Sequence, residues 1–180
     1  MPTTKQTSQP IAFTGNPEQL GDRTIIRLPD DASAQLPSRG QVAAHAMIGE
    51  HQQRIVVEPD GMRGHWIGID DELGERLGGG EVAVSLTPTK DWPEPELPSD
   101  FSAALGGAPH LAEVWAGLTP MARWEWVRWI GATKNPETRA KRVRVSISKL
   151  EDGKRRPCCF DLSSCTDPEL SKSGKLISAD

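Results

Sequence analysis

24-TIIRLPDDASAQLPSRGQVAAHAMI-48 and 65-HWIGIDDELGERLGGGEVAVSL-86 follow one pattern at an offset of 40 residues. In each stretch an apolar strand meets a pair of aspartates, then a short helical stretch, a glycine turn and a second strand. The aspartates suit a helix start, where free backbone N–H groups and the helix dipole favour negative charge. The identities are few: Asp30-Asp31 with Asp70-Asp71, Gly40 with Gly80, and Val42 with Val82. Two such units predict a small pseudo-symmetric β-barrel, because closing a sheet removes its exposed edges.

The predicted elements divide the chain into five parts. Strands are expected at residues 24–28, 41–48, 54–58, 65–69 and 81–86. Four prolines within residues 88–100 predict an extended connector, and helix starts follow at Ser99-Asp100, Pro109, Thr119-Pro120 and Asn135-Pro136. The sequence therefore predicts an α+β chain with a disordered N-terminus (1–10), a small β-barrel (11–88), a Pro-rich connector (89–99), a helical region (100–161) and a flexible tail (162–180).

Positive charge and tryptophan gather in residues 123–161. This segment holds three of the six Trp and eleven of the 21 Lys and Arg residues, against five carboxylates, so it carries +6 in a chain of net charge −4. Such asymmetry indicates a cationic surface that could meet an anionic partner. The net negative charge of the whole chain argues against a dedicated DNA-binding protein, which is usually basic overall.

The two last predicted helices can be divided into faces at about 100° per residue. Trp126, Val127, Trp129 and Ile130 share one side of the first and are expected in the core, whereas Trp124 lies opposite, four residues before Arg128. In the second helix, an apolar stripe faces an arc of cations made of Arg139, Lys141, Arg142 and Lys149. This arc is either a solvated surface whose long stems shield apolar atoms, or one wall of a site for an anionic molecule.

A ligand crevice is expected along the seam between barrel and helices, since binding sites often lie at domain junctions. Trp92 and Trp115 are expected to pack in this seam. His65-Trp66 is either the edge of a pocket at the barrel mouth or ordinary packing. The candidate ligand-binding residues are His65, Trp66, Trp92, Trp124, Arg128, Arg139 and Arg142.

The order of these motifs resembles that of the YdeI/OmpD-associated, bacteriocin-protection family. Its helical motifs are matched by Leu118-Thr119-Pro120 and by residues 126–130, 137–142 and 153–161, and its barrel motifs by Pro59-Asp60-Gly61, Gly64-His65 and residues 80–84. The resemblance covers residues 11–161. It implies a small barrel, similar to the double-split barrels of the AbrB/MazE group, followed by a helical region. The family label implies protection or association rather than a defined reaction.

The sequence does not support a membrane-spanning, secreted, metal-binding or nucleotide-binding protein. No apolar run reaches the roughly 18 residues of a membrane span, and the N-terminus lacks the apolar stretch of a secretory signal. The odd, clustered set Cys158, Cys159 and Cys165 fits a reducing compartment, so a cytoplasmic protein is expected. The four histidines lack helical metal-site spacing, and no nucleotide loop or nucleophile elbow is present. No metal, cofactor or membrane partner is expected.

Three functions remain open. The first is a non-enzymatic binding or protection protein that recognises a small anionic or aromatic molecule in the crevice. The second is a nucleic-acid-associated regulator that uses the basic last helix. The third, which we rank last, is an enzyme with a Cys, His or acid–base pair in the same crevice.

Overall fold

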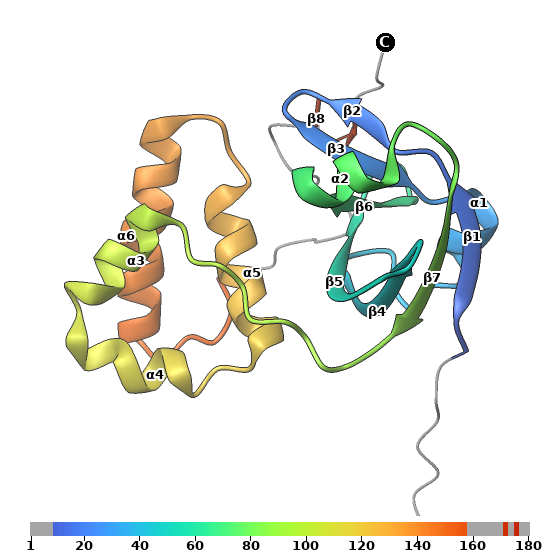
Figure 1. The fold of residues 1–180 in the computed structure, drawn as a ribbon. Helices are drawn as coiled ribbons and strands as arrows, with labels where there is room; N and C mark the ends of the chain where they lie inside the picture. Colours follow the sequence, from blue (N-terminus) through green and yellow to red (C-terminus); the bar gives the residue numbers. More distant parts are fainter. Residues whose placement is uncertain (1–8, 158–170, 173–174, 177–180) are drawn as a thin grey trace, which may run out of the picture.

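An antiparallel sheet of seven strands curls on itself in the first half of the chain, and a helical domain follows (Figure 1). The computed structural model describes residues 9–157, 171–172 and 175–176. The sheet domain contains β1 (Ile11–Gly15), β2 (Glu18–Leu20), β3 (Arg23–Arg27), α1 (Asp30–Ala34), β4 (Val42–Ile48), β5 (His51–Pro59), β6 (His65–Ile69), α2 (Asp71–Leu77) and β7 (Val82–Pro88). The predicted α+β class and barrel-like N-terminal domain are confirmed.

The two copies of the repeat pair with each other, strand by equivalent strand. β4 of the first copy lies antiparallel to β7 of the second, and β3 lies antiparallel to β6. In the β4–β7 ladder Ala46 stands opposite Leu86, which is its equivalent at the offset of 40 residues. An antiparallel pair that matches equivalent positions is what a local two-fold axis produces, so the sequence repeat is a structural pseudo-symmetry.

β5 joins the two halves of the sheet, whose order is β1-β7-β4-β5-β6-β3-β2. Its residues 51–57 pair with β4, and its last two, Glu58 and Pro59, pair with Trp66 and His65 of β6. Glu58 therefore lies where the strand changes partners. The edge strands β1 and β2 were not predicted, since both lie outside the repeated stretches and are short.

Apolar side chains from both copies fill the interior of the curled sheet. Ile26, Ile48, Val57, Ile67 and Leu86 are fully buried there. The aspartates of the repeat act as expected at the second helix, where the Asp70 carboxylate accepts the backbone N–H of Leu73 at 2.7 Å.

The helical domain consists of α3 (Ser99–Gly106), a short 3-10 turn η1 (Pro109–Leu111), α4 (Ala112–Ala116), α5 (Pro120–Gly131) and α6 (Pro136–Glu151). The predicted starts of its two longest helices are confirmed. Thr119 accepts the backbone N–H of Ala122, and the side chain of Asn135 accepts those of Glu137 and Thr138. Gly153 has a φ of +78°, and the N–H of Lys154 reaches back to the carbonyl of Lys149, so a left-handed glycine ends α6 as predicted.

A second apolar core holds these helices together. Trp126 and Ile130 of α5 are completely buried in it, together with Phe101 of α3. Trp115 packs edge-on against Phe101 with ring centroids 5.3 Å apart. The prediction that Trp115 packs between barrel and helices is therefore wrong. It fills the space between the short helices, because α4 turns its face toward α3 rather than toward the sheet domain.

Two pieces of the last segment return to the sheet domain. β8 (Ser171–Lys172) pairs with β9 (Lys175–Leu176), and the backbone N–H of Leu176 donates to the carbonyl of Asp60 at 2.8 Å. The Leu176 side chain is buried in a small cluster with Leu20, Ile25 and Trp66. At these residues the structure differs from the expected flexible tail, because one apolar side chain finds a matching apolar surface. Cys158, Cys159 and Cys165 lie outside the described residues.

His65 ties α1 to the sheet through two buried hydrogen bonds. Its Nε2 lies 2.9 Å from the carbonyl of Gly40, and its Nδ1 lies 2.7 Å from the hydroxyl of Ser33. A carbonyl only accepts, so Nε2 carries the proton and Nδ1 accepts the Ser33 hydroxyl proton. Arg39 donates to the same hydroxyl oxygen at 3.2 Å. Burial lowers the pKa of His65 from its ordinary value, and the nearby Arg39 charge acts in the same direction.

This network predicts that the sheet domain loses stability in mild acid. Unfolded His65 binds a proton near its ordinary pKa, whereas the folded residue binds it only at lower pH. The free energy of unfolding should therefore fall as the pH drops below about 6.5, with this residue contributing at most about 1.4 kcal/mol per pH unit. Urea unfolding between pH 7.5 and 5 measures the slope. His65→Gln should flatten it, whereas the exposed His45→Gln should not; equal slopes in the two variants would contradict the assignment.

Candidate functional site

A cavity of about 700 Å³ lies between the sheet domain and the helical domain. The cationic side chains at its wall are Arg23 of β3, Arg128 of α5, Lys134 of the α5–α6 loop and Arg139 of α6, and Glu58 of β5 is the one carboxylate among the described lining residues. Trp124, Val127 and Pro98 supply apolar surface. A cavity is thus present at the seam where a ligand crevice was expected, and its size is within the usual range of small-molecule sites.

One face of α5 forms the wall on the helical side. Trp124, Val127, Arg128 and Gly131 line the cavity, and they follow one another at spacings of three, one and three residues. These spacings place them on a single helical face. Trp126 and Ile130 face the helical core instead. The α5 side chains that line the cavity therefore lie on a different face of the helix from those that pack in the helical core.

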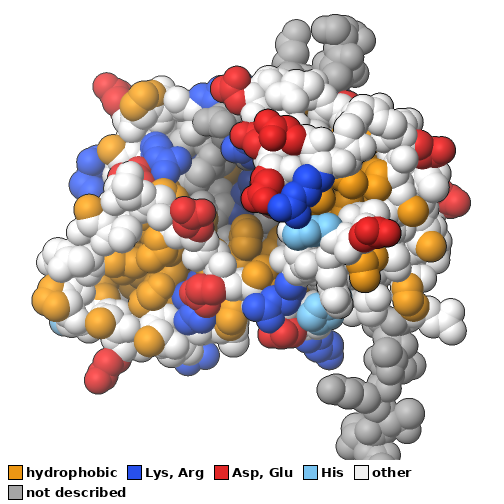
Figure 2. Space-filling view, viewed as in Figure 1, with side chains coloured by type: hydrophobic (Ala, Val, Ile, Leu, Met, Phe, Trp, Pro, Cys, Tyr) orange, Lys and Arg blue, Asp and Glu red, His pale blue; other side chains and the backbone are white. Residues whose placement is uncertain are grey.

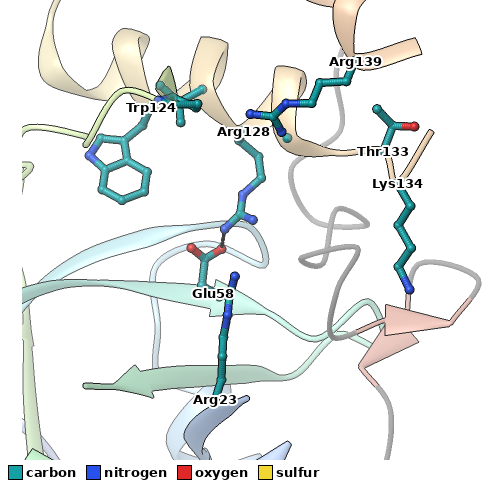
Figure 3. A pocket seen from close by; sticks show the side chains of 10 residues that line it. Arg23, Glu58, Trp124, Arg128, Thr133, Lys134 and Arg139 are labelled. Atoms are coloured by element: carbon teal, nitrogen blue, oxygen red, sulfur yellow. Dashed lines mark ion pairs between the residues drawn. The ribbon is translucent and has the colours of Figure 1, made fainter. Parts of the chain in front are cut away.

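The indole of Trp124 is fixed by the Pro-rich connector. Its Nε1–H donates to the carbonyl of Pro93 at 2.6 Å. The neighbouring Arg123 forms an ion pair with Glu94, and it also donates to the carbonyl of Leu118 at 2.7 Å. The connector lacks regular structure, as predicted, but these contacts attach it to α5. They hold the indole ring in one orientation beside the cavity (Figure 3).

An ion pair between Arg128 and Glu58 crosses the floor of the cavity (Figure 3). The two side chains are only 12% and 11% exposed, so both charges are largely removed from water. The Gln41 amide also donates to this carboxylate: its Nε2 lies 3.0 Å from Glu58 Oε2, the oxygen that Arg128 contacts. Figure 3 also shows Arg23 rising from β3 toward the same carboxylate. Glu58 thus lies between guanidinium groups from both domains.

The opposite end of the cavity is formed where α5 passes into α6. Thr133 and Lys134 of the loop stand apart from Trp124 in Figure 3. Arg139 approaches from α6 and binds both oxygens of Asp100, at 2.7 and 3.1 Å. The Arg139 guanidinium holds the pKa of Asp100 below its ordinary value. This pair attaches α6 to the start of α3 and keeps the Arg139 side chain along the cavity edge.

The surface around the seam combines charge with apolar area. Figure 2 shows a hollow between the two domains that contains blue basic and orange apolar side chains, with acidic side chains on its rim. Within the described part of the chain, no three or more His, Cys, Asp or Glu side chains gather as a metal site would require. No helix among the described residues is long and apolar enough to span a bilayer.

The structure brings together three of the seven candidate residues. Trp124, Arg128 and Arg139 line the cavity. His65 and Trp66 are buried inside the sheet domain, where the Trp66 indole donates to the carbonyl of Pro59 at 3.1 Å. Trp92 is a half-buried residue of the connector and is not among the cavity-lining residues.

Arg142 lies outside the cavity lining, although it was a candidate residue. It donates to the carbonyl of Trp129 at 2.8 Å and stacks over that indole, 5.4 Å from the ring centroid. Lys149 stacks over the same ring at 5.5 Å. Two cations of the predicted basic arc therefore cover a tryptophan, because their long stems pack on apolar surface while the charged ends lie over the ring.

Sequence reasoning missed Arg23, Glu58, Pro98, Val127, Gly131, Thr133 and Lys134. The prediction that Val127 lies in the core with Trp126 and Ile130 is wrong, because Val127 lines the cavity on the same helical face as Trp124. Gly131 could have been found from its helical spacing to Trp124. Arg23 and Glu58 could not, since they are brought to the cavity by strands that meet the helical domain only in the folded chain. A strand-end carboxylate such as Glu58 is usually a solvated residue.

The partly buried ion pair predicts a measurable coupling across the seam. A double-mutant cycle of Glu58→Gln and Arg128→Gln should give a coupling free energy of about 1–3 kcal/mol in urea unfolding, because each single change leaves the partner charge buried. The matched control is the exposed pair of Arg54 and Asp91, with side chains 39% and 66% exposed. Its cycle should give roughly 0–1 kcal/mol. Similar values for the two cycles would show that the seam pair is as hydrated as a surface pair.

Comparison with known families agrees with the division into two domains. The model of the bacteriocin-protection, YdeI or OmpD-associated family matches residues 94–153, which contain the helical domain and half of the connector. The model of a domain of unknown function, DUF1905, matches residues 12–86, which contain the curled sheet. A search of curated proteins found no match. The helical domain therefore matches the bacteriocin-protection, YdeI or OmpD-associated family, and the sheet domain that precedes it matches a DUF1905 domain.

Proposed function

We propose that this chain is a non-enzymatic binding protein that takes up a small aromatic anion in the cavity between its two domains. The observation that carries the proposal is the composition of the cavity wall, where the described lining residues include four cationic side chains, one carboxylate and a fixed indole. Basic groups attract and orient an anion, and an aromatic wall with little conformational freedom offers a stacking surface at low entropic cost.

The side chains at the cavity favour binding over catalysis. Its described polar groups are guanidinium groups, an ammonium, a threonine and an ion-paired carboxylate. Guanidinium groups stay protonated in proteins, so they are binding groups rather than proton carriers. A chain that binds a harmful small molecule, or holds a metabolite in reserve, is compatible with the word "protection" in the name of its family.

The arrangement of the last helix makes nucleic-acid binding the weaker alternative. Arg142 and Lys149 cover Trp129, and Arg139 is paired with Asp100. Arg156 binds both oxygens of the buried Glu125, at 2.8 and 3.1 Å. Much of the positive charge of residues 123–161 is therefore engaged within the helical domain rather than displayed as a continuous strip for phosphates.

The proposal predicts that aromatic acids stabilise the chain and quench Trp124. Benzoate and indole-3-acetate should raise the melting temperature, and neutral benzyl alcohol should do so far less. Trp124→Ala should abolish the effect, whereas Trp124→Phe, which keeps an aromatic ring, should retain much of it. Trp92→Ala is the matched control because it removes a connector indole outside the cavity lining. Differential scanning fluorimetry measures all of these. Equal responses of Trp124→Ala and Trp92→Ala would place the ligand elsewhere.

A further inference from the structure

A second cavity, of about 680 Å³, lies on the sheet domain between α1 and the turn that joins β5 to β6. Ser33 and Arg39 line it on one side, and Asp60 and Gly64 of the turn line it on the other. It shares no described lining residue with the cavity at the seam. Its wall therefore contains one end of the buried hydrogen-bond network that holds His65.

Ser33 and His65 have the geometry of a nucleophilic hydroxyl and its general base. The hydroxyl oxygen of Ser33 lies 2.7 Å from Nδ1 of His65, and Nε2 of the same ring donates to the carbonyl of Gly40 at 2.9 Å. The lowered pKa of His65 keeps Nδ1 unprotonated at neutral pH, so this nitrogen is ready to accept the hydroxyl proton. Nucleophile, base and orienting group follow one another as in an activated serine, with a backbone carbonyl in the place of the usual carboxylate.

Arg39 places a positive charge beside the same hydroxyl. Its Nη1 donates to Ser33 Oγ at 3.2 Å and to the carbonyl of Arg63 at 2.9 Å, and its Nη2 donates to the carbonyls of Ser33 and Leu36. These bonds fix the guanidinium group against the cavity wall. A fixed cation at this position stabilises the negative charge that develops on oxygen when a carbonyl group is attacked.

The cavity restricts which molecules can reach Ser33. Ser33 and His65 are each only 2% exposed, and Ser33 is a lining residue whereas His65 is not. A reactive carbonyl has to come to the wall of the cavity, which favours a small acyl donor over a folded polypeptide. Once Ser33 carries an acyl group, that group stands between water in the cavity and Nδ1, so hydrolysis of the acylated serine is slow.

We propose that Ser33 is a nucleophile that a small ester acylates, with His65 as its base. Ser33 Oγ forms a bond to the carbonyl carbon of the ester while its proton passes to Nδ1 of His65. The bond from this carbon to the leaving oxygen then breaks, and the leaving oxygen keeps the electron pair and takes the proton from Nδ1. The products are acylated Ser33 and a free alcohol. This single transfer goes beyond the binding function at the seam and does not depend on it.

The test is mass spectrometry of the full chain after treatment with p-nitrophenyl acetate, and separately with phenylmethylsulfonyl fluoride, which sulfonylates activated serines. Peptide mapping of the wild-type chain should place one added group on Ser33, whereas the exposed Ser102 of α3 should stay unmodified. Release of p-nitrophenolate should show a burst of one equivalent and then a rate roughly tenfold lower or less, because the acylated serine hydrolyses slowly.

Variants separate the roles of the two side chains. Ser33→Ala should remove the burst, and Ser102→Ala, the matched control, should keep it. His65→Gln keeps a polar side chain without a base, so it should slow the acylation of Ser33 by about 10²- to 10⁴-fold. Far-UV circular dichroism shows whether this variant is folded.

Mapping of the wild-type chain decides the site without any variant. If Ser33 of the wild-type chain stays unmodified, the nucleophile assignment is wrong. If folded His65→Gln acylates Ser33 at the wild-type rate, the histidine is not the base. Either result leaves the response of Trp124 to aromatic acids untouched, so failure here is distinguishable from failure of the proposed function.

Discussion

The pairing of β4 with β7 is the constraint on which the remaining architecture depends. It joins equivalent strands of the two repeat copies and places β7, with its edge partner β1, beside β4 and β5. Its register is specified by burial, because Ala44, Ala46 and Ile48 face the core while Met47 is 40% exposed. A slip of one residue would exchange these faces. The same register sets the position of β5, which carries Glu58 to the seam with the helical domain.

Among the described residues, the sheet domain and the helical domain keep separate apolar cores, and an ion pair joins the two domains across the seam. The Arg128–Glu58 ion pair crosses the seam, whereas the Arg54–Asp91 pair joins β5 to the connector and the Trp124 indole joins α5 to the connector. Each domain fills its own core, so the space between them is free of packing requirements. The cavity, with its charged side chains of both signs and one aromatic ring, lies between these two apolar cores. Each core is filled without side chains from the other domain.

Much of the fold could be predicted from local sequence signals, whereas only part of the site could. The repeat indicated the paired strands, and Thr119, Asn135 and Gly153 marked helix ends because capping is a local interaction. The shared helical face of Trp124 and Arg128 could also be predicted, because the two residues are four positions apart. The contribution of the sheet domain was not, because Arg23 and Glu58 reach the cavity only through tertiary contacts. His65 was misleading for a related reason: a polar residue beside a glycine turn looks accessible in sequence, yet Ser33 and Gly40 satisfy it in the interior.

The return of β9 to the sheet domain has a consequence for how the chain is made. Leu176 completes the small cluster of Leu20, Ile25 and Trp66, so the sheet domain draws on residues that lie beyond the whole helical domain in sequence. During synthesis these apolar side chains emerge from the ribosome long before the leucine that covers them. The nascent first domain therefore carries an uncovered apolar cluster until Leu176 has been translated, and a fragment that ends after β7 would leave this cluster uncovered.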